Sequence, residues 1–298
     1  MQFELGQLQA LRAAVDTGSL DAAARQLHVT PSAISQRLKA LETTVGRRLL
    51  VRARPVVATD AGERVLRLAR QIELLQADAA RELTDAGARG PIELPIAANA
   101  DSLDTWLFPA LAAAGGELVL DVRREDEDRT AALLRRGAVV AAVTAAVTPV
   151  SGCSSTKLGT LRYRPTATHG FVARWFAEGI TPDALSQAPV VHFDRNDDLQ
   201  RRWLQDRIGD RPPPPGHHIP STEAFERAVR SGLGWGMLSE YQLAGDRTPA
   251  VITLDDQVAE VALYWQRWRS STPSLDHLTD LVVAAARRAL FQPDTERR

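Results

Sequence analysis

"AARQLHVTPSAISQRLKALE", residues 23–42, contains two short apolar repeats that are separated by three residues, His28 to Thr30. Apolar residues recur at helical spacing from Leu20 to Leu27, which predicts a short first helix. Thr30 and Pro31 then form a typical helix start, with an N-cap hydroxyl and a proline at the first helical position. The stretch therefore predicts two helices joined by a tight turn.

The second predicted helix has two contrasting faces. Apolar residues recur every three or four positions and should face inward: Ile34, Leu38, Leu41 and Val45. The opposite face carries small, polar or basic residues: Pro31, Ser32, Ser35, Gln36 and Lys39. Small residues allow close approach to the floor of a DNA major groove, and a glutamine there can pair with adenine. We expect this face to bind double-stranded DNA; the alternative is an ordinary helical hairpin with one solvated side.

A basic segment follows the second helix. Gly46 is a typical C-terminal cap, and "RRLLVRARPVVAT" (47–59) has the alternation of a β-hairpin, with residues 49–51 opposite residues 56 and 57. The segment carries four arginines, Arg47, Arg48, Arg52 and Arg54. We expect Arg52 and Arg54 to contact DNA phosphates from a wing beside the second helix, since phosphate contacts give affinity without sequence information.

The charge distribution favours the same end of the chain for DNA. The net charge of the 298 residues is only −1, yet residues 1–58 carry eight basic and four acidic side chains. The remaining residues carry 28 basic and 33 acidic side chains. A basic end on an otherwise acidic chain suggests a polyanionic partner, although a solvated charged face would give the same count.

Composition restricts the other classes of protein. The single cysteine, Cys153, excludes an intramolecular disulfide, and the first residues lack the basic and apolar regions of a secretory signal. No apolar run resembles a membrane span, so we expect a cytoplasmic protein without a membrane partner. His217 and His218 lack further ligands at metal-binding spacing, and no nucleophile elbow or phosphate loop is visible. We therefore expect no metal, no cofactor and no catalytic residues.

A long helix is predicted after the hairpin. Thr59 begins the run "TDAGERVLRLARQIELLQADAARELTDAG" (59–87), in which Val65, Leu68, Ile72, Leu75, Ala79 and Leu83 form an apolar seam with charged flanks. Such a seam on an exposed rod is typical of a dimerising helix, and Val65, Leu68, Ile72 and Leu75 are the predicted contacts. The alternative is a helix that packs on its own domain. "GARGP" (87–91) ends the run.

The rest of the chain alternates between strands and helices. Short buried strands are predicted in "IELPIAA", "ELVLDVRR", "AVVAAVTAA", "PVVHFD" and "GWGMLSE", with amphipathic helices between them. This order predicts doubly wound parallel sheets. We expect "RPPPPGHH" (211–218) to be an exposed loop and "SLDHLTDLVVAAARRALF" to be a closing helix, whereas residues 151–156 show no clear pattern.

The stretch "GSLDAAARQLHVTPSAISQRLKALETTVGRRLLVR" (18–52) resembles the winged helix-turn-helix of the LysR-type transcriptional regulators. The resemblance implies a mostly α-helical winged helix-turn-helix DNA-binding domain over residues 1–58 and a linker and dimerisation helix over 59–88. It also implies an α/β effector-binding domain over 89–298, similar to periplasmic binding proteins. Its two subdomains would be lobe I (about 89–160 and 269–298) and lobe II (about 161–268). The family further implies dimers that pair into tetramers, and RNA polymerase as a possible partner.

Five segments in the effector half resemble the subgroup of these regulators that controls basic-amino-acid exporters: "NADSLDTWLFPAL", "REDEDRT", "FDRNDDL", "STEAFERAVRSG" and "LYWQRW". The resemblance implies lysine or arginine as the effector and activation of an exporter gene. Ligands of open α/β sheets bind beyond the carboxyl ends of strands, where Ser102 and Thr222 could meet a carboxylate. For a cationic side chain the candidate acids are Asp101, Glu125, Asp126, Asp128, Asp194 and Glu223.

Two other functions stay open at this point. A nucleoid-associated or replication-modulating protein would use the same DNA-binding domain without an effector and would bind DNA almost regardless of sequence. A small-molecule enzyme with a DNA-binding domain would turn over a substrate, although no acid–base pair favours it. A footprint over one promoter that depends on a ligand would separate both from a regulator.

Overall fold

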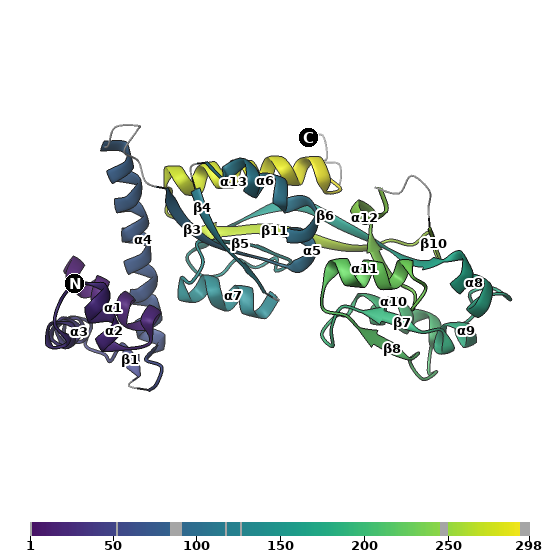
Figure 1. Ribbon diagram of the computed structural model, residues 1–298, viewed down its shortest axis with the longest axis horizontal. Coiled ribbons are helices and arrows are strands. Elements are labelled where there is room, and N and C mark those ends of the chain that lie inside the picture. The colour runs from purple at the N-terminus through teal and green to yellow at the C-terminus, as the bar shows by residue number, and fades with distance from the viewer. Residues whose placement is uncertain are drawn as a thin grey trace.

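The computed structural model describes residues 2–51, 53–83, 91–116, 118–125, 127–244 and 250–292, and for Glu127 and Asp128 it describes the backbone alone. A small helical head lies at one end of the molecule and a two-lobed α/β domain extends to the other end (Figure 1). A long helix, α4 (Asp60–Leu83), stands between them. This three-part order agrees with the predicted one.

The head consists of three helices and a short β-ribbon. Its elements are α1 (Leu5–Thr17), α2 (Leu20–Gln26), α3 (Pro31–Val45), β1 (Leu50–Val51) and β2 (Val57–Ala58). The apolar face predicted for α3 lies in the core, where Ile34, Leu38 and Leu41 pack against α1 and α2. Thr30 caps α3 as predicted, because its side chain accepts a hydrogen bond from the Ala33 amide.

Helix α4 belongs partly to the head and partly to the effector domain. Thr59 caps it, since the Thr59 hydroxyl accepts a 3.0 Å hydrogen bond from the Gly62 amide. Val65, Leu66 and Ala69 are buried in the head core, whereas Leu74 is buried in the core of the effector domain. Apolar contacts within its own chain therefore anchor the N-terminal half of the rod to the head and the middle of the rod to the effector domain.

Lobe I is built on parallel strands. β3 (Ile92–Ala98) pairs in parallel with β4 (Leu118–Arg124) on one side and with β5 (Ala141–Thr144) on the other. The chain between β3 and β4 forms α5 (Ala100–Ser102), a π-helical turn, η2 (Leu103–Leu107), and α6 (Phe108–Ala114). Helices α6 and α13 (Pro273–Ala289) cover one face of the sheet, and α7 (Glu127–Arg136) lies on the other face (Figure 1).

Two long strands connect the lobes, and they correct the prediction of purely parallel sheets. β6 (Cys153–Thr168) and β11 (Ala259–Trp268) pair antiparallel along their length, with a register shift between Leu263 and Tyr264. β11 also pairs antiparallel with β5 through residues 264–267. The expected lobe boundary at residue 269 therefore falls too late, because the second half of β11 already belongs to the sheet of lobe I. The unassigned segment 151–156 is the turn into β6 and the start of that strand.

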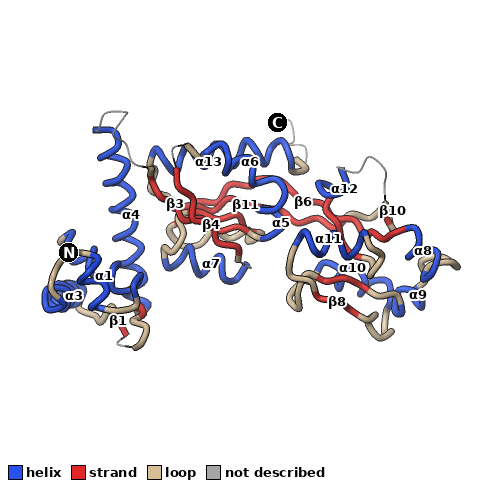
Figure 2. The backbone as a smooth tube through the Cα atoms, in the orientation of Figure 1, coloured by secondary structure: helices blue, strands red, loops and turns tan. Residues whose placement is uncertain are grey.

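Lobe II carries shorter strands and most of the small helices (Figure 2). Its helices are α8 (His169–Trp175), α9 (Pro182–Gln187), α10 (Leu199–Ile208), α11 (Thr222–Arg230) and α12 (Glu240–Ala244). Its strands are β7 (Val190–His192), β8 (Gly216–His218), β9 (Gly236–Ser239) and β10 (Val251–Thr253). The segment predicted as a loop over 211–218 ends in β8, which pairs in parallel with β7. That part of the prediction was wrong because the proline run hid a three-residue strand.

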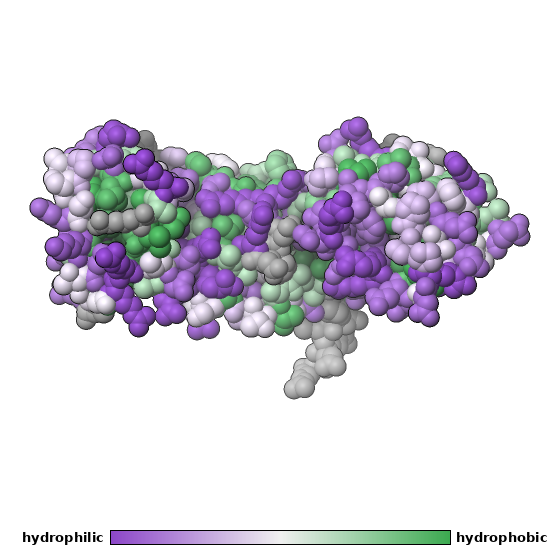
Figure 3. Space-filling view, turned by 90° about the horizontal axis from the view of Figure 1, so that it is seen from below, coloured by the Kyte–Doolittle hydropathy of each residue, from purple (hydrophilic) through white to green (hydrophobic). Residues whose placement is uncertain are grey.

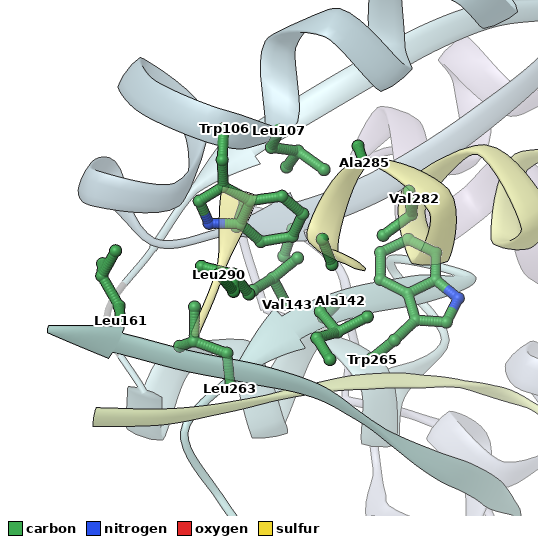
Figure 4. Packing of buried hydrophobic residues seen from close by; sticks show 14 of the residues in the cluster. Trp106, Leu107, Ala142, Val143, Leu161, Leu263, Trp265, Val282, Ala285 and Leu290 are labelled. Carbon is green, nitrogen blue, oxygen red and sulfur yellow. The ribbon is translucent and has the colours of Figure 1, made fainter. Parts of the chain in front are cut away.

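The main core lies between α13 and the sheet of lobe I. Trp106 and Trp265 pack there with aliphatic residues of the strands and of α13 (Figure 4). Trp203 and Trp235 pack together in lobe II with ring centroids 5.1 Å apart. These four tryptophans are core residues. No helix in the described ranges is long and apolar enough to cross a membrane.

Candidate functional site

The predicted DNA-binding face of α3 is exposed. Pro31, Ser32, Ser35, Gln36 and Lys39 are all exposed, and the buried residues of α3 lie on the other side of the helix. The Thr30 and Ser32 hydroxyls are 2.9 Å apart at the start of the helix. The face can therefore enter a groove without moving any core residue.

The turn before α3 is held in an unusual backbone conformation. His28 has a φ of 53°, the only positive φ at a residue other than glycine in the described chain. Its amide and the Val29 amide donate to carbonyls of α2, at 3.2 and 3.0 Å, so the turn is fixed by backbone hydrogen bonds. This geometry sets the angle at which α3 leaves α2.

The wing is fixed to both neighbouring helices. Glu42, an acid of α3, accepts a 2.8 Å hydrogen bond from the Leu49 amide. On the other side, a Cβ atom at Gly62 would lie 2.0 Å from the Leu49 carbonyl oxygen, so α4 approaches the wing as closely as only glycine allows. In β1 and β2, Leu50 pairs with Ala58 and Val51 with Val57, which confirms the predicted hairpin.

Three of the four wing arginines lie among the described residues. Arg47, Arg48 and Arg54 are exposed, whereas Arg52 lies outside the described residues. Val51 and Val57 are 47% and 44% exposed. Seen from below, the head end of the molecule carries an apolar area within a mostly hydrophilic surface (Figure 3). The head thus combines an exposed polar helix face with a ribbon that has exposed cationic and apolar side chains.

The predicted seam on α4 is only partly open. Val65 is 7% exposed and belongs to the head core, so it packs on its own domain and not on an open seam. Leu68 and Ile72 are partly buried, while Leu75 and Leu83 are 45% and 89% exposed. The C-terminal half of the helix is the part that presents apolar side chains.

Two of the predicted effector residues, Asp101 and Thr222, meet at the junction of the lobes. Asp101 lies in α5 of lobe I, directly after β3, and its carboxylate accepts a 2.6 Å hydrogen bond from the Tyr163 hydroxyl on β6. The Thr222 hydroxyl, at the start of α11 in lobe II, donates to the other carboxylate oxygen at 3.4 Å. Residues 101, 163 and 222 thereby join lobe I, a connecting strand and lobe II.

Burial controls the ionisation of this cluster. Removal from water raises the pKa of Asp101 above the ordinary carboxyl value, against the hydrogen bonds from Tyr163 and Thr222. The pKa of Tyr163 is raised well above its ordinary value, first by burial and then by the charge of Asp101. Asp197 adds to both shifts through its negative charge. A cation placed here would stabilise the charged form of Asp101.

Ser102 supplies a buried hydroxyl beside Asp101. Its side chain is 0% exposed, and Oγ has no hydrogen-bond partner. The Ser102 amide already donates to the Asn99 side chain at 3.0 Å, so it is not an open donor for a ligand. A buried hydroxyl without a partner is costly, so the side chain of Ser102 remains a candidate ligand-binding group.

Glu125 lies at the same edge of the sheet. Its amide donates to the Ala98 carbonyl at 3.2 Å, and its carboxylate lies 3.6 Å from Arg129. Asp128 lies in the first turn of α7 by its backbone, but its side chain is outside the description, as is Asp126 altogether. Glu125 is therefore the acid of this segment whose position supports the prediction.

The structure gives Asp194 and Glu223 other roles. Asp194 accepts hydrogen bonds from the amides of Asn196 and Asp197, at 2.7 and 3.0 Å, and so stabilises the loop after β7. The side chain of Glu223 is 83% exposed and lies 3.5 Å from Arg227, one turn along α11. Neither carboxylate is positioned as the sequence predicted, since one is used by its own loop and the other faces solvent.

Two residues of the junction were missed at the sequence level. Tyr163 lies in β6, whose register could not be assigned from the sequence, and nothing local marks it as a partner of Asp101. Asp197 belongs to the segment "FDRNDDL", in which Asp194 is the predicted effector-binding acid. Among the described residues no group of three or more His, Cys, Asp or Glu side chains is arranged to hold a metal ion.

The architecture of this chain, a winged head, a linker helix and a two-lobed α/β domain, is that of a known class of regulator. Residues 5–63 match the family model of bacterial regulatory helix-turn-helix proteins of the lysR family, and residues 93–287 match that of the LysR substrate binding domain. The chain belongs to the LysR family of transcriptional regulators. The enzyme alternative is thereby set aside.

Particular relatives are similar over nearly the whole chain. The lysine export transcriptional regulatory protein LysG of Corynebacterium efficiens is 45% identical over 291 residues, which covers 95% of this chain and 98% of that protein. The crystal structure of ArgP from Mycobacterium tuberculosis is 41% identical, with a TM-score of 0.90 and coverage of 99% of this chain and 100% of that one. Full-length LysG from Corynebacterium glutamicum with bound effector Arg is also 41% identical, with a TM-score of 0.85 and coverage of 98% and 100%.

Proposed function

We propose that this regulator senses a basic amino acid, arginine or lysine, at the junction of its two lobes. The bound amino acid changes how the protein engages the promoter of an exporter gene. The names of the similar LysG proteins and the arginine in one of their structures support the choice of effector. The carrying observation in this chain is the carboxylate of Asp101, which is held between groups of both lobes.

Asp101 is suited to an ammonium or guanidinium group. Its carboxylate is partly buried, and burial disfavours its charge, so an ion pair with a ligand would relieve that cost. Tyr163 and Thr222 fix the carboxylate from two directions, which leaves its orientation defined before a ligand arrives. Glu125, at the same sheet edge, supplies a second negative charge.

The hydroxyl of Ser102 is suited to the carboxylate that all amino acids share. It is the next residue after Asp101, and its unpartnered Oγ can donate one hydrogen bond. Asp101 would therefore bind the cationic part of the ligand, and Ser102 would bind its carboxylate. Removing either residue should have a different effect on different amino acids.

We also propose that two copies pair through the exposed part of α4. Leu75 and Leu83 are exposed leucines on a rod whose Val65, Leu66, Ala69 and Leu74 are buried within the chain. Pairing would present two DNA-binding faces, as a two-fold operator requires. Pairs of dimers would form the tetramer.

Calorimetry with a panel of amino acids tests the effector. Arginine and lysine should bind, and norleucine, which keeps the chain length of lysine without its charge, should bind at least about tenfold more weakly, because a desolvated ion pair is typically worth about 2–5 kcal/mol. Asp101→Asn should weaken the binding of arginine, whereas Ser102→Ala should weaken the binding of every amino acid that the protein binds, by a smaller factor. Asp104→Asn is the matched control, since Asp104 is exposed and lies on the next turn of the same segment.

The alternative of sequence-blind architectural binding is tested with DNA. A duplex selected by the protein from a random pool should bind far more tightly than an unselected duplex, and arginine should change its affinity. Equal binding of norleucine and lysine, or no binding of either basic amino acid, would refute the proposed effector and leave the DNA-binding assignment intact.

A further inference from the structure

We infer that helix α7 carries the effector signal from the lobe junction to the linker helix, through a contact between its C-terminal end and the N-terminal half of α4. This inference rests on the proposed function, because it concerns how a ligand at the junction reaches the head. It identifies an interdomain contact whose loss should uncouple the two sites while leaving both of them able to bind.

Polar contacts join the C-terminal end of α7 to α4. The Arg136 guanidinium lies 2.9 Å from the Glu63 carboxylate in the first turns of α4. The carbonyl of Arg136 accepts a 3.4 Å hydrogen bond from Arg70. Close by, Arg67 donates a 2.8 Å hydrogen bond to the Ser151 carbonyl, in the turn that leads into β6. Three turns of α4 thus contact lobe I.

The backbone packing at this contact is tight. Gly137, directly after α7, has a φ of 69°, and a Cβ atom there would lie 2.9 Å from the Cα atom of Arg67. A side chain at this position would therefore strain its own backbone and push against the backbone of α4. The close approach means that a displacement of α7 cannot be absorbed by flexible side chains alone.

The other end of α7 adjoins the effector junction. The chain enters the helix from β4 through Glu125, whose amide is bonded to Ala98, the last residue of β3. Asp101 and Ser102 follow that same strand after two residues. An α-helix of ten residues spans about 15 Å and transmits axial displacement with little loss. Movement of the ligand-binding edge is therefore passed to Arg136 and Gly137.

On the far side of α4 the contact continues into the head. Arg70 also donates to the Asp16 carboxylate at the end of α1, so one guanidinium contacts both lobe I and the head. Arg12 of α1 lies 3.1 Å from Glu73, one turn further along α4. A shift of α7 against α4 would therefore move the same side chains that hold the head.

Charge exchange at the α7–α4 contact tests the inference in the full-length protein. The affinity for arginine is measured by calorimetry. The affinity for the selected duplex is measured with and without arginine, and the ratio of these two DNA affinities is the coupling factor. In the wild type we expect a factor within the usual allosteric range of about 5 to 150. Arg136→Glu and Glu63→Arg should each bring it close to one, with arginine affinity changed by no more than about threefold.

The double exchange and a backbone variant make the test specific. Glu63→Arg combined with Arg136→Glu should restore the coupling factor, because the ion pair reforms in the opposite sense. Gly137→Ala should also reduce coupling, whereas Gly179→Ala, with a φ of 96° and open space around its Cβ position, should not. Arg211→Glu is the control for charge, since Arg211 pairs with Asp183 in lobe II.

The outcomes separate this inference from the proposed function. If both single exchanges and Gly137→Ala keep the wild-type coupling factor, α7 is not the route and the inference is overturned, while the effector assignment stands. If wild-type protein binds arginine without any change in DNA affinity, there is no signal for α7 to carry and the inference is likewise overturned. Absence of binding of both arginine and lysine in the wild type would overturn both.

Discussion

The hydroxyl of Tyr163 donates a 2.6 Å hydrogen bond to the carboxylate of Asp101. These residues are 62 positions apart, and the bond ties the first helical turn of lobe I to a strand that runs on into lobe II. Thr222 adds a contact from α11 to the same carboxylate. The position of the Asp101 carboxylate therefore depends on how the two lobes are oriented relative to each other, and a change in that orientation would change its contacts.

Asp101→Asn should stabilise the protein near neutral pH. Because the pKa of Asp101 is raised in the folded state, the folded protein binds more protons than the unfolded one between the ordinary and the raised pKa. Stability contributed by this residue therefore falls as pH rises through that window, and the full penalty is present above it. The carbonyl oxygen of asparagine can accept from one of the two hydroxyls, and its amide group can donate to the other, without the charge.

Thermal unfolding across pH 4 to 8 measures this effect. The variant should melt above the wild type at the upper end of the range, and the two curves should approach each other toward the acid end. Arginine binding should be weaker in the same variant, so stability and ligand affinity change in opposite directions. A variant that melts below the wild type at neutral pH would show that the charge of Asp101 stabilises the fold.

Gln36→Ala should reduce sequence discrimination. Gln36 is exposed on the DNA-binding face of α3, where a bidentate contact to a base is worth about 1–3 kcal/mol. Affinity for the selected duplex should fall by that amount, and affinity for an unselected duplex should hardly change. Fluorescence anisotropy with both duplexes measures the difference, with the exposed Gln187 of lobe II as the site of the control substitution. Equal losses on both duplexes would exclude base recognition by Gln36.

Arg54→Ala should weaken binding to all duplexes alike. Arg54 is exposed on the wing, and a phosphate contact contributes affinity without regard to sequence. The dependence of log affinity on log salt should become shallower by about one for each lost phosphate contact. Titrations between low and moderate salt give the slope, and Arg288→Ala, at the exposed end of α13, serves for comparison. An unchanged slope would place Arg54 away from the backbone of DNA.

Leu75→Glu should dissociate the proposed dimer. The side chain of Leu75 is 45% exposed in the single chain, and full burial of a leucine is worth about 1.5–3 kcal/mol per copy. Sedimentation at micromolar concentration should show a shift toward monomer together with weaker binding to the selected duplex. Gln76→Glu introduces the same charge at the adjacent exposed position and should leave the assembly intact. A wild-type protein that is monomeric under these conditions would contradict pairing through α4.

Local rules predicted the head well. The start of α3, its buried residues, its exposed face and the hairpin all follow from capping and helical periodicity, which act within a few residues. The apolar seam of α4 was also predicted, but its division into residues buried within the chain and residues exposed on the rod was not. Val65 is buried in the core of the head, where α4 packs on α1, and such a contact depends on the tertiary angle between helices.

The effector site was harder to predict because its parts come from distant segments. Asp101, Ser102 and Thr222 were found because they begin helices after strands, which is a local signal. Asp194 and Glu223 satisfied the same signal and yet serve a loop and a solvent-exposed pair. Tyr163 carries no signal of its own, since its role arises from the antiparallel register of β6 and β11.

The absence of a side chain at Gly62 has a consequence for operator architecture. Because α4 touches the carbonyl of Leu49 at that position, the wing and the rod meet at an angle that cannot open or close without breaking the head core. Any pair of copies joined through α4 would inherit that angle twice, so the separation of its two recognition surfaces would be set by how the two rods lie against each other. Adaptation to a differently spaced promoter would then require a change in the rod beyond Gly62 or in the DNA itself, by bending.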